Sequence, residues 1–201
     1  MKVSLIINTA CGDPMAQDVP TRAALYKDRY EYLKRIVNEF GPVCDEVIVA
    51  GKIPDGRLDG VHKYVELVGG YGDRRDALLQ REMGARASTG DALIFTHDDH
   101  LPRWTRADFE REYADAWDIL VPERRHGITE ELLNNGREDG YMGGHTLVMR
   151  RDLWIRVPWV TVVPERCWDL PMTRVWQREG ATIAYSDILQ SVDLEAKVDE
   201  V

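Results

Sequence analysis

The feature that most constrains the fold of this chain is the alternation of short apolar runs and helical stretches over its first half. The apolar runs cover residues 3–9, 46–50, 64–68 and 92–96. Between them, residues 20–40 and 73–88 repeat apolar side chains at spacings of three and four, which predicts helices. Because the runs lack polar alternation, we expect strands covered on both faces. The pattern indicates an α/β domain with a mainly parallel central sheet flanked by helices.

The second half of the chain has a less regular pattern. It predicts helices over 104–117 and 169–179, and short strands over 118–121, 146–149 and 181–185. A glycine-rich segment over 134–145 predicts a mobile loop, which would be either a plain linker or a lid over a site. We therefore expect one domain over 1–190, with its two halves at 1–102 and 103–190, and an acidic tail over 191–201.

Composition narrows the class of protein. The chain has 201 residues, enough for one domain with a substantial core, and a formal net charge of −9 argues against indiscriminate binding of nucleic acid. Residues 120–180 are neutral, with nine basic and nine acidic side chains, which leaves a local anion site open. We expect no membrane span and no signal peptide, and three scattered cysteines predict reduced thiols, so we expect a cytoplasmic protein, or one in the host cytoplasm if viral.

Four polar side chains, His97-Asp98-Asp99-His100, directly follow the apolar run over 92–96. Adjacent carboxylates repel each other, so a positive partner is expected close by. A hard divalent cation takes oxygen ligands, which makes the pair a candidate metal site, and the alternative is a solvated turn. Whether either histidine helps to bind a metal stays open, because side chains alternate in direction along an extended chain.

These residues belong to a series that resembles the GT-A-fold glycosyltransferases, above all the inverting family 2. The resemblance covers nearly the whole chain and depends on four segments in order. They are Asn8-Thr9 at the end of the first strand, Gln80-Arg81-Glu82-Met83-Gly84 followed by Gly90-Asp91, the Asp98-Asp99 pair, and Cys167-Trp168-Asp169 followed by Arg174 and Gly180.

The resemblance implies roles for the residues of the first half. Asp99 would be the main ligand of Mn²⁺ or Mg²⁺, and Asp98 would contact the donor's ribose or assist the metal. Arg81, and less strongly Arg75, would lie near the nucleotide and its phosphates, where a guanidinium suits oxygen acceptors. Thr9 would also border the nucleotide. Arg81 on a solvated helix face is the alternative.

Asp169 matches the family's catalytic base, which deprotonates an acceptor hydroxyl opposite the leaving group. The alternative is that Asp169 only caps a helix. The chain departs from the family pattern in three places. His97 replaces the first acidic residue of the motif, the second strand ends in Gly51 where many relatives have an acidic residue, and no late histidine follows the last strand, where Asp187 is the nearest substitute.

The resemblance therefore implies a metal-dependent transferase that moves a sugar, hexosyl or pentosyl, from a nucleotide-sugar to a hydroxyl with inversion. A UDP-sugar is the default donor, with residues 1–102 as the donor half and 103–190 as the acceptor half. The compact core is similar to phage-type enzymes that glycosylate 5-hydroxymethylpyrimidines in DNA, and Arg124, Arg125, Arg137, Arg150, Arg151 and Arg156 are candidate phosphate contacts. A nucleotidyltransferase of similar architecture and an inactive nucleotide-sugar-binding module are the alternatives. The sequence leaves the oligomeric state open.

Overall fold

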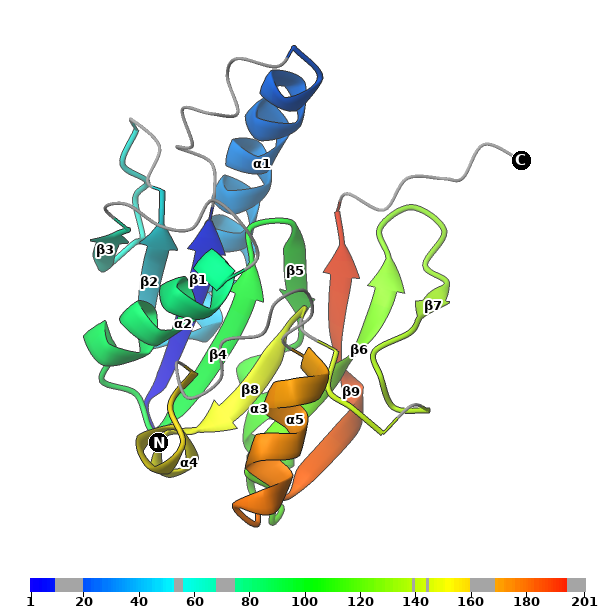
Figure 1. The fold of residues 1–201 in the computed structure, drawn as a ribbon. Helices are drawn as coiled ribbons and strands as arrows, with labels where there is room; N and C mark the ends of the chain where they lie inside the picture. Colours follow the sequence, from blue (N-terminus) through cyan, green and yellow to red (C-terminus); the bar gives the residue numbers. More distant parts are fainter. Residues whose placement is uncertain are drawn as a thin grey trace.

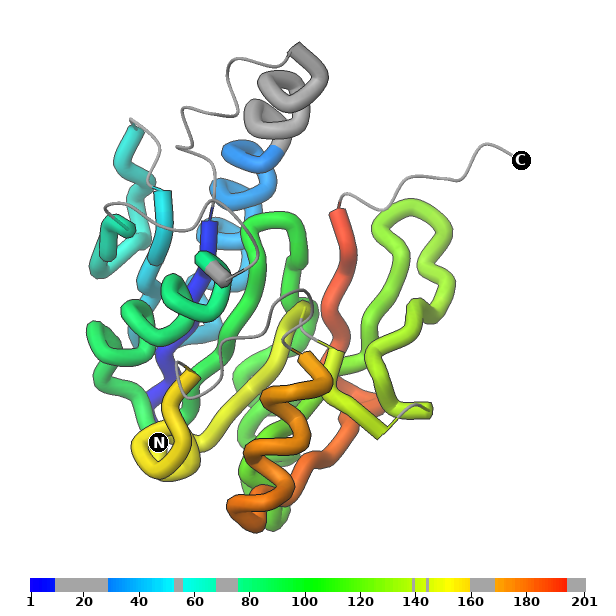
Figure 2. The backbone as a smooth tube through the Cα atoms, in the orientation of Figure 1, coloured from blue at the N-terminus to red at the C-terminus, as the bar shows by residue number. Residues whose placement is uncertain are grey.

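A central β-sheet with helices on both faces forms the body of the protein, in a computed structural model that describes residues 1–9, 20–52, 56–67, 75–138, 140–143, 145–159 and 169–194 (Figures 1 and 2). The side chains of residues 20–28 and 75 lie outside the described part. The strands are β1 (Val3–Thr9), β2 (Glu46–Gly51), β3 (Lys63–Glu66), β4 (Ala92–His97), β5 (His100–Arg103), β6 (Ile119–His126), β7 (Leu132–Leu133), β8 (Leu147–Arg150) and β9 (Ile183–Asp193). The helices are α1 (Pro20–Glu39), α2 (Arg75–Ala87), α3 (Arg106–Tyr113), α4 (Arg151–Arg156) and α5 (Asp169–Arg178), with a 3₁₀ turn, η2 (Gly41–Val43).

The sheet runs in the order β3-β2-β1-β4-β8-β6-β9-β5, and β7 pairs with β6. Strands β3, β2, β1 and β4 are parallel, but β8 is antiparallel to both β4 and β6, and β5 is antiparallel to β9. The expectation of a mainly parallel sheet therefore holds for β3, β2, β1 and β4 and for the β6–β9 pair, but not for the pairs that β8 and β5 form. Parallel neighbours need a crossover connection, usually helical, and the described residues between β6 and β8 contain no helix.

Two hydrophobic cores cover the two faces of the sheet, as the uninterrupted apolar runs predict. In β1, Leu5 and Ile7 pack on one face, against Leu33 of α1 and Phe109 of α3. Ile6 lies on the other face, in the core that contains residues of α2, α4 and α5. The alternation arises because successive side chains of a strand point to opposite faces. Both faces are apolar, so the polar ends of the strands are where chemistry is concentrated.

Several elements of the second half differ from their predictions. Strand β5 and helix α4 are additional, and β9 continues to Asp193, so residues 191–193 belong to the sheet and not to the acidic tail. The segment expected as a mobile loop forms hydrogen-bonded turns, in which the Gly143 amide donates to the Asn135 carbonyl over 2.7 Å. Met142 in this segment is fully buried, which the glycine content alone does not indicate.

The connections of β1 place a site at one edge of the sheet. β1 lies between β2 and β4, with all three strands parallel, so their carboxyl ends lie at the same edge. The chain runs from β1 outward through β2 and β3 before it returns to β4 on the other side of β1. In open α/β sheets such a reversal is where ligands bind, outside the carboxyl ends of the strands. The polar residues at the carboxyl ends of β1 and β4 are Asn8, Thr9, His97 and Asp98.

Candidate functional site

The acidic pair forms the turn that joins β4 to β5. Asp98 and Asp99 occupy its two positions, and they are 1% and 8% exposed. The parallel register sets Asn8 of β1 beside His97 of β4, which brings the next residue, Thr9, close to Asp98. The Thr9 hydroxyl donates to Oδ2 of Asp98 over 2.7 Å. The solvated-turn alternative is therefore wrong for these carboxylates, which are buried and fixed by the ends of two core strands.

Arg29 of α1 supplies the positive partner that two adjacent carboxylates require. Its Nη1 lies 2.9 Å from Oδ1 of Asp98, and its Nη2 lies 2.9 Å from Oδ2 of Asp99. The guanidinium thus bridges the pair, with one nitrogen for each carboxylate. The sequence prediction missed Arg29, because nothing in the pattern of α1 distinguishes this arginine from those on its solvated face.

His100 and Asp193 extend the polar cluster behind Asp99. The His100 ring nitrogen Nδ1 lies 2.5 Å from Oδ1 of Asp99, and Nε2 lies 3.7 Å from Oδ2 of Asp193. Burial raises the pKa of Asp99, but the charge and hydrogen bond of His100 outweigh it, so this pKa lies below its usual range. Arg124 of β6 forms an ion pair with Asp193.

The late acidic residue beside His100 is Asp193, and not Asp187, which the sequence offered as the nearest substitute. The register between β5 and β9 pairs His100 with Asp193. Asp187 is instead exposed and pairs with Arg137. The error follows from the strand prediction, which ended the last strand at residue 185 and left Asp193 in a tail.

Arg81 of α2 lies under the carboxyl ends of β1 and β4 and is fully buried. Its Nε donates to Oδ1 of Asn8 over 3.4 Å, and its Nη2 donates to the His145 carbonyl over 3.2 Å. The guanidinium carbon also lies 5.0 Å from the centre of the Trp159 ring. Burial lowers the pKa of Arg81 to about 9, while the negative charge of Asp169 acts in the opposite direction. The alternative of a solvated Arg81 is therefore wrong.

His97 is neutral in this environment. Burial and then the Arg81 charge lower its pKa to about 3. Its Nδ1 lies 2.6 Å from Nδ2 of Asn8, and since an amide nitrogen only donates, Nδ1 accepts this hydrogen bond. The nitrogen lone pair is thus used within the protein, and His97 replaces the motif's first acidic residue by a neutral group.

Asp169 is the first residue of α5 and is partly buried. Its charge acts on Arg81, which relates the start of α5 to the buried guanidinium. The Asp169 carbonyl accepts from the Thr173 hydroxyl over 2.7 Å, and that hydroxyl accepts from the Met142 amide over 3.1 Å. These bonds hold the glycine-rich segment against α5. The side chain of Arg75, at the start of α2, lies outside the described residues.

Gly51 explains why the second strand does not end in an acidic residue. Its φ is +135°, a conformation that favours glycine, and a Cβ there would lie 2.1 Å from the Thr9 carbonyl oxygen. The same Cβ would lie 2.9 Å from the amide nitrogen of Gln80. Any side chain at this position would force β1 and β2 apart, so an acidic residue cannot replace Gly51 in this backbone.

The residues present fit a divalent cation by their chemistry. Asp98 and Asp99 offer carboxylate oxygens, and Mg²⁺ in proteins is often held by one or two carboxylates together with substrate phosphates. Within the described ranges, no group of three or more His, Cys, Asp or Glu side chains is arranged to hold a metal ion. A cation at the pair would therefore take its remaining ligands from water or from a phosphate-bearing ligand.

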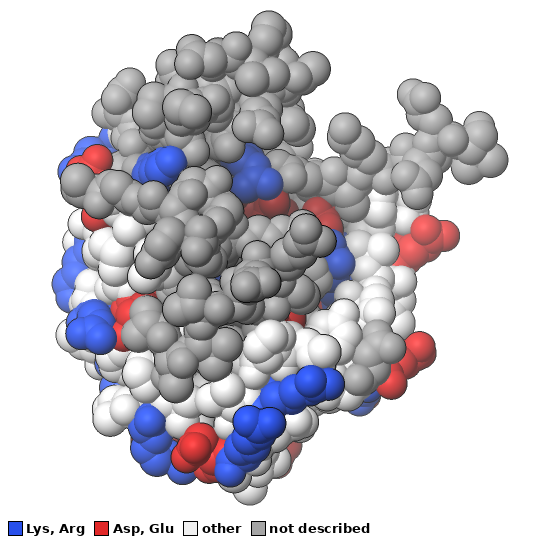
Figure 3. Space-filling view, viewed as in Figure 1, with Lys and Arg blue, Asp and Glu red and all other residues white. Residues whose placement is uncertain are grey.

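Charged side chains of both signs lie next to each other on the site face, between α1 and β9, and others lie over α4 and α5 (Figure 3). The six arginines predicted as phosphate contacts all have partners inside the protein. Arg124, Arg125, Arg137 and Arg156 pair with carboxylates, and Arg150 and Arg151 donate to backbone carbonyls. Their positive charge is therefore largely neutralised or used for packing.

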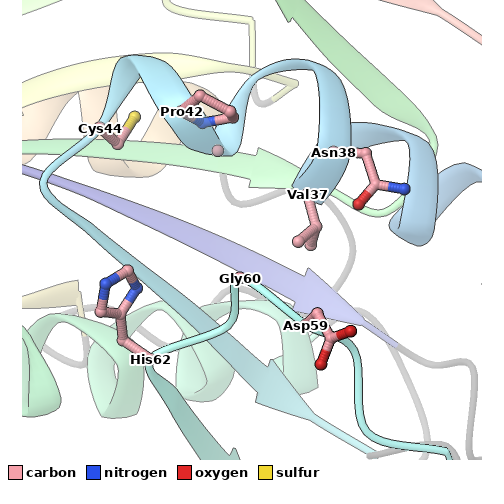
Figure 4. Close-up of a pocket in the computed structure, with 8 residues that line it drawn as sticks. Val37, Asn38, Pro42, Cys44, Asp59, Gly60 and His62 are labelled. Atoms are coloured by element: carbon pink, nitrogen blue, oxygen red, sulfur yellow. The ribbon is translucent and has the colours of Figure 1, made fainter.

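Two cavities lie at the opposite edge of the sheet from the acidic pair. One, of about 370 Å³, lies between the end of α1, η2 and the segment before β3, with Cys44 and His62 on its wall (Figure 4). The other, of about 330 Å³, is lined by residues that include Asp91 and Arg150. Burial raises the pKa of the Cys44 thiol to about 12, so it is not a nucleophile at neutral pH. Neither cavity is lined by a residue of the predicted site.

Comparison with known proteins gives a fold but no family. No protein family matches the sequence, and no curated protein does. The structure resembles S. aureus TarS 1–349 in complex with UDP-GlcNAc, with a TM-score of 0.60, 11% identity, and coverage of 98% of this chain and 60% of that one. The complex of TarS 1–349 with UDP gives a TM-score of 0.59 at 11% identity, over 96% of this chain and 60% of that one. Another structure of S. aureus TarS gives a TM-score of 0.60 at 12% identity, over 94% of this chain and 36% of that one.

These likenesses support the GT-A-like glycosyltransferase fold that the sequence predicts. The chain spans about 60% of TarS 1–349 and 36% of the chain in the other TarS structure. None of the described helices is long and apolar enough to cross a membrane.

Proposed function

We propose that this protein is a glycosyltransferase that moves a sugar from a nucleotide-sugar, by default a UDP-sugar, to a hydroxyl acceptor. One observation supports the proposal above the others. Thr9, Arg81 and the Asp98-Asp99 pair lie together at the edge where β1 and β4 end, in a fold similar to a protein solved with UDP-GlcNAc and with UDP. In such folds this edge is where nucleotides bind.

The residues of this edge suit the donor's diphosphate. Arg81 would lie near its phosphates and supply positive charge, and Thr9 would hold Asp98 toward the ribose. Asp98 and Asp99 would hold Mn²⁺ or Mg²⁺, and such a cation supplies charge neutralisation for a departing diphosphate. The buried setting strengthens each of these electrostatic interactions relative to water.

Asp169 is our proposed base, and the reaction would be a single displacement with inversion. Its carboxylate would accept the proton of the acceptor hydroxyl as the oxygen attacks the anomeric carbon and the bond to the diphosphate breaks. The proposal is supported by the effect of the Asp169 charge on the pKa of Arg81, which relates Asp169 to the proposed donor site.

The acceptor is proposed only as a hydroxyl compound, and the transferred group as a hexose or a pentose. A 5-hydroxymethylpyrimidine in DNA stays a candidate, but the engaged arginines of residues 120–180 argue against it. The acidic net charge weakens DNA attraction further. The proposal places the protein in the cytoplasm, or in the host cytoplasm if it is viral.

A donor panel tests the proposal. Purified protein is incubated with UDP-, GDP-, CMP- and dTDP-sugars, with Mn²⁺, with Mg²⁺ or with excess chelator, and nucleotide release is measured. We expect release from one donor class, dependent on the cation. In a parallel incubation with nucleoside triphosphates and sugar 1-phosphates, release of pyrophosphate would instead identify a nucleotidyltransferase. Tight nucleotide binding without any release would identify an inactive binding module. Adding DNA that contains 5-hydroxymethylcytosine or 5-hydroxymethyluracil, followed by mass spectrometry of nucleosides, tests the DNA acceptor.

A further inference from the structure

Arg29 joins α1 to the acidic pair in a way that differs from an ordinary ion pair. A guanidinium commonly binds both oxygens of one carboxylate. Here Nη1 bonds to Asp98 and Nη2 bonds to Asp99, each over 2.9 Å, and the Arg29 side chain is only 25% exposed. The arginine therefore offsets one of the two negative charges of the pair and ties the turn after β4 to α1.

The other two carboxylate oxygens of the pair have partners in the strands, Thr9 of β1 and His100 of β5. Oδ2 of Asp98 accepts from the Thr9 hydroxyl, and Oδ1 of Asp99 lies 2.5 Å from the His100 ring. The two oxygens that bond to Arg29 are therefore the ones that both carboxylates can offer to a shared ligand. A divalent cation that these oxygens would help to hold competes with the guanidinium for them, and two cations there would also repel each other.

We infer that Arg29 is the resident counter-ion of the acidic pair, and that a divalent cation enters by displacing the guanidinium. This inference depends on the cation that the proposed function includes. In the exchange, Asp98 and Asp99 keep their two negative charges, one unit of positive charge leaves with Arg29, and two units enter with the cation. No proton or covalent bond changes. Arg29 thus lowers the affinity for the cation and couples the position of α1 to its binding.

The first experiment measures cation affinity directly. Mn²⁺ is titrated into the wild type, Arg29→Gln, Arg29→Lys and Arg35→Gln, and free Mn²⁺ is followed by electron paramagnetic resonance. Arg35 is the matched control, since it lies on the same helix and pairs with Glu39 on the surface. We expect affinity to rise at least about tenfold in Arg29→Gln, because the competitor is gone. The Mn²⁺ affinity of Arg29→Lys should lie between those of the wild type and Arg29→Gln, because a lysine has one point of contact in place of two. The Mn²⁺ affinity of Arg35→Gln should match that of the wild type.

A second readout separates displacement of Arg29 from simple electrostatic repulsion of the cation by an Arg29 side chain that stays in place. Hydrogen exchange of the amides near residue 29 is measured with and without saturating Mg²⁺. Displacement of Arg29 removes a tertiary contact of α1, so we expect these amides to exchange faster when the cation is bound. In Arg29→Gln the contact is already absent, so Mg²⁺ should leave their exchange unchanged.

The outcomes distinguish this inference from the proposed function. If the wild type and Arg29→Gln bind Mn²⁺ equally well, or if Arg29→Gln binds it more weakly, displacement is overturned while the cation site stands. If no variant binds Mn²⁺ and nucleotide release is unaffected by chelator, both displacement and the cation part of the proposed function are overturned. If Mg²⁺ slows exchange near residue 29, Arg29 stays in place and the inference fails.

Discussion

Replacing Arg81 by methionine separates the contribution of this side chain to stability from its contribution to donor binding. Burial lowers the pKa of Arg81 from 12.5 to about 9, with Asp169 acting in the opposite sense. At pH 7 the guanidinium is charged in both the folded and the unfolded state. The difference between the two pKa values therefore means that burial of the charge costs the folded state about 5 kcal/mol. In the wild type, this cost is offset by the bonds that the guanidinium makes.

Those bonds can be weighed from the structure. Arg81 donates to the Asn8 side chain and to the His145 carbonyl, and hydrogen bonds from a charged group contribute about 1.5–3 kcal/mol each. Methionine is unbranched and adaptable, so it can pack against the Trp159 ring where the guanidinium lay. In Arg81→Met, the free energy gained by no longer burying a charge and the free energy lost with the two hydrogen bonds cancel to within about 2 kcal/mol. We therefore expect only a small change in melting temperature. We also expect a fall in UDP affinity of at least about 100-fold, because the positively charged guanidinium near the diphosphate is gone.

Calorimetry at two pH values and UDP titration check this reasoning. Between pH 9 and 12.5 the unfolded chain binds more protons at this residue than the folded one, so the wild type gains stability relative to Arg81→Met as the pH rises above about 9. Arg86→Met, on the exposed side of the same helix, is the control and should behave as the wild type. A loss of more than about 4 kcal/mol at pH 7 with unchanged UDP affinity would show that Arg81 serves the fold and not the donor.

Three further predictions concern single carboxylates. Asp169→Asn keeps the side-chain shape but removes its basicity, so transfer should be abolished while UDP affinity stays within about threefold; a joint loss of affinity and melting temperature would identify a structural residue. Asp99→Ala should lower turnover at least about 100-fold and abolish its dependence on Mn²⁺; full activity in this variant would exclude Asp99 as the ligand. Burial raises the pKa of Glu46, but hydrogen bonds from Ser4 and a backbone amide outweigh it and lower the pKa from 4.5 to about 2. Stability from this residue is therefore lost as the pH falls from about 4.5 to 2, by up to about 3 kcal/mol, and the acid loss of Glu46→Gln should be smaller than that of the wild type by this amount.

Local pattern predicts the elements of the first half well. The apolar runs over 3–9, 46–50 and 92–96 correspond to β1, β2 and β4, and the helical spacing over 20–40 corresponds to α1. Each depends on side-chain periodicity within one segment, which is visible in the sequence. The same local signals place Thr9, Asp98 and Asp99 at strand ends.

The second half is less predictable because its strands are defined by their partners. β9 contains polar residues such as Ser186 and Gln190, and its length comes from pairing with β6 and β5. β5 is a short segment directly after the acidic turn, and its strand character depends on the same pairing. No periodicity within these segments indicates their extent, so the predicted last strand ended before Asp193.

The sequence by itself determined the class of the fold, the strands that end at the site, and the acidic pair between β4 and β5. Only the tertiary structure decided which charges meet that pair. Arg29 reaches it because α1 packs on the sheet, and Asp193 reaches it because the register of β5 and β9 sets it opposite His100. The physical reason is that a side chain's partner depends on the packing of distant elements, while its element depends mainly on its neighbours in the chain.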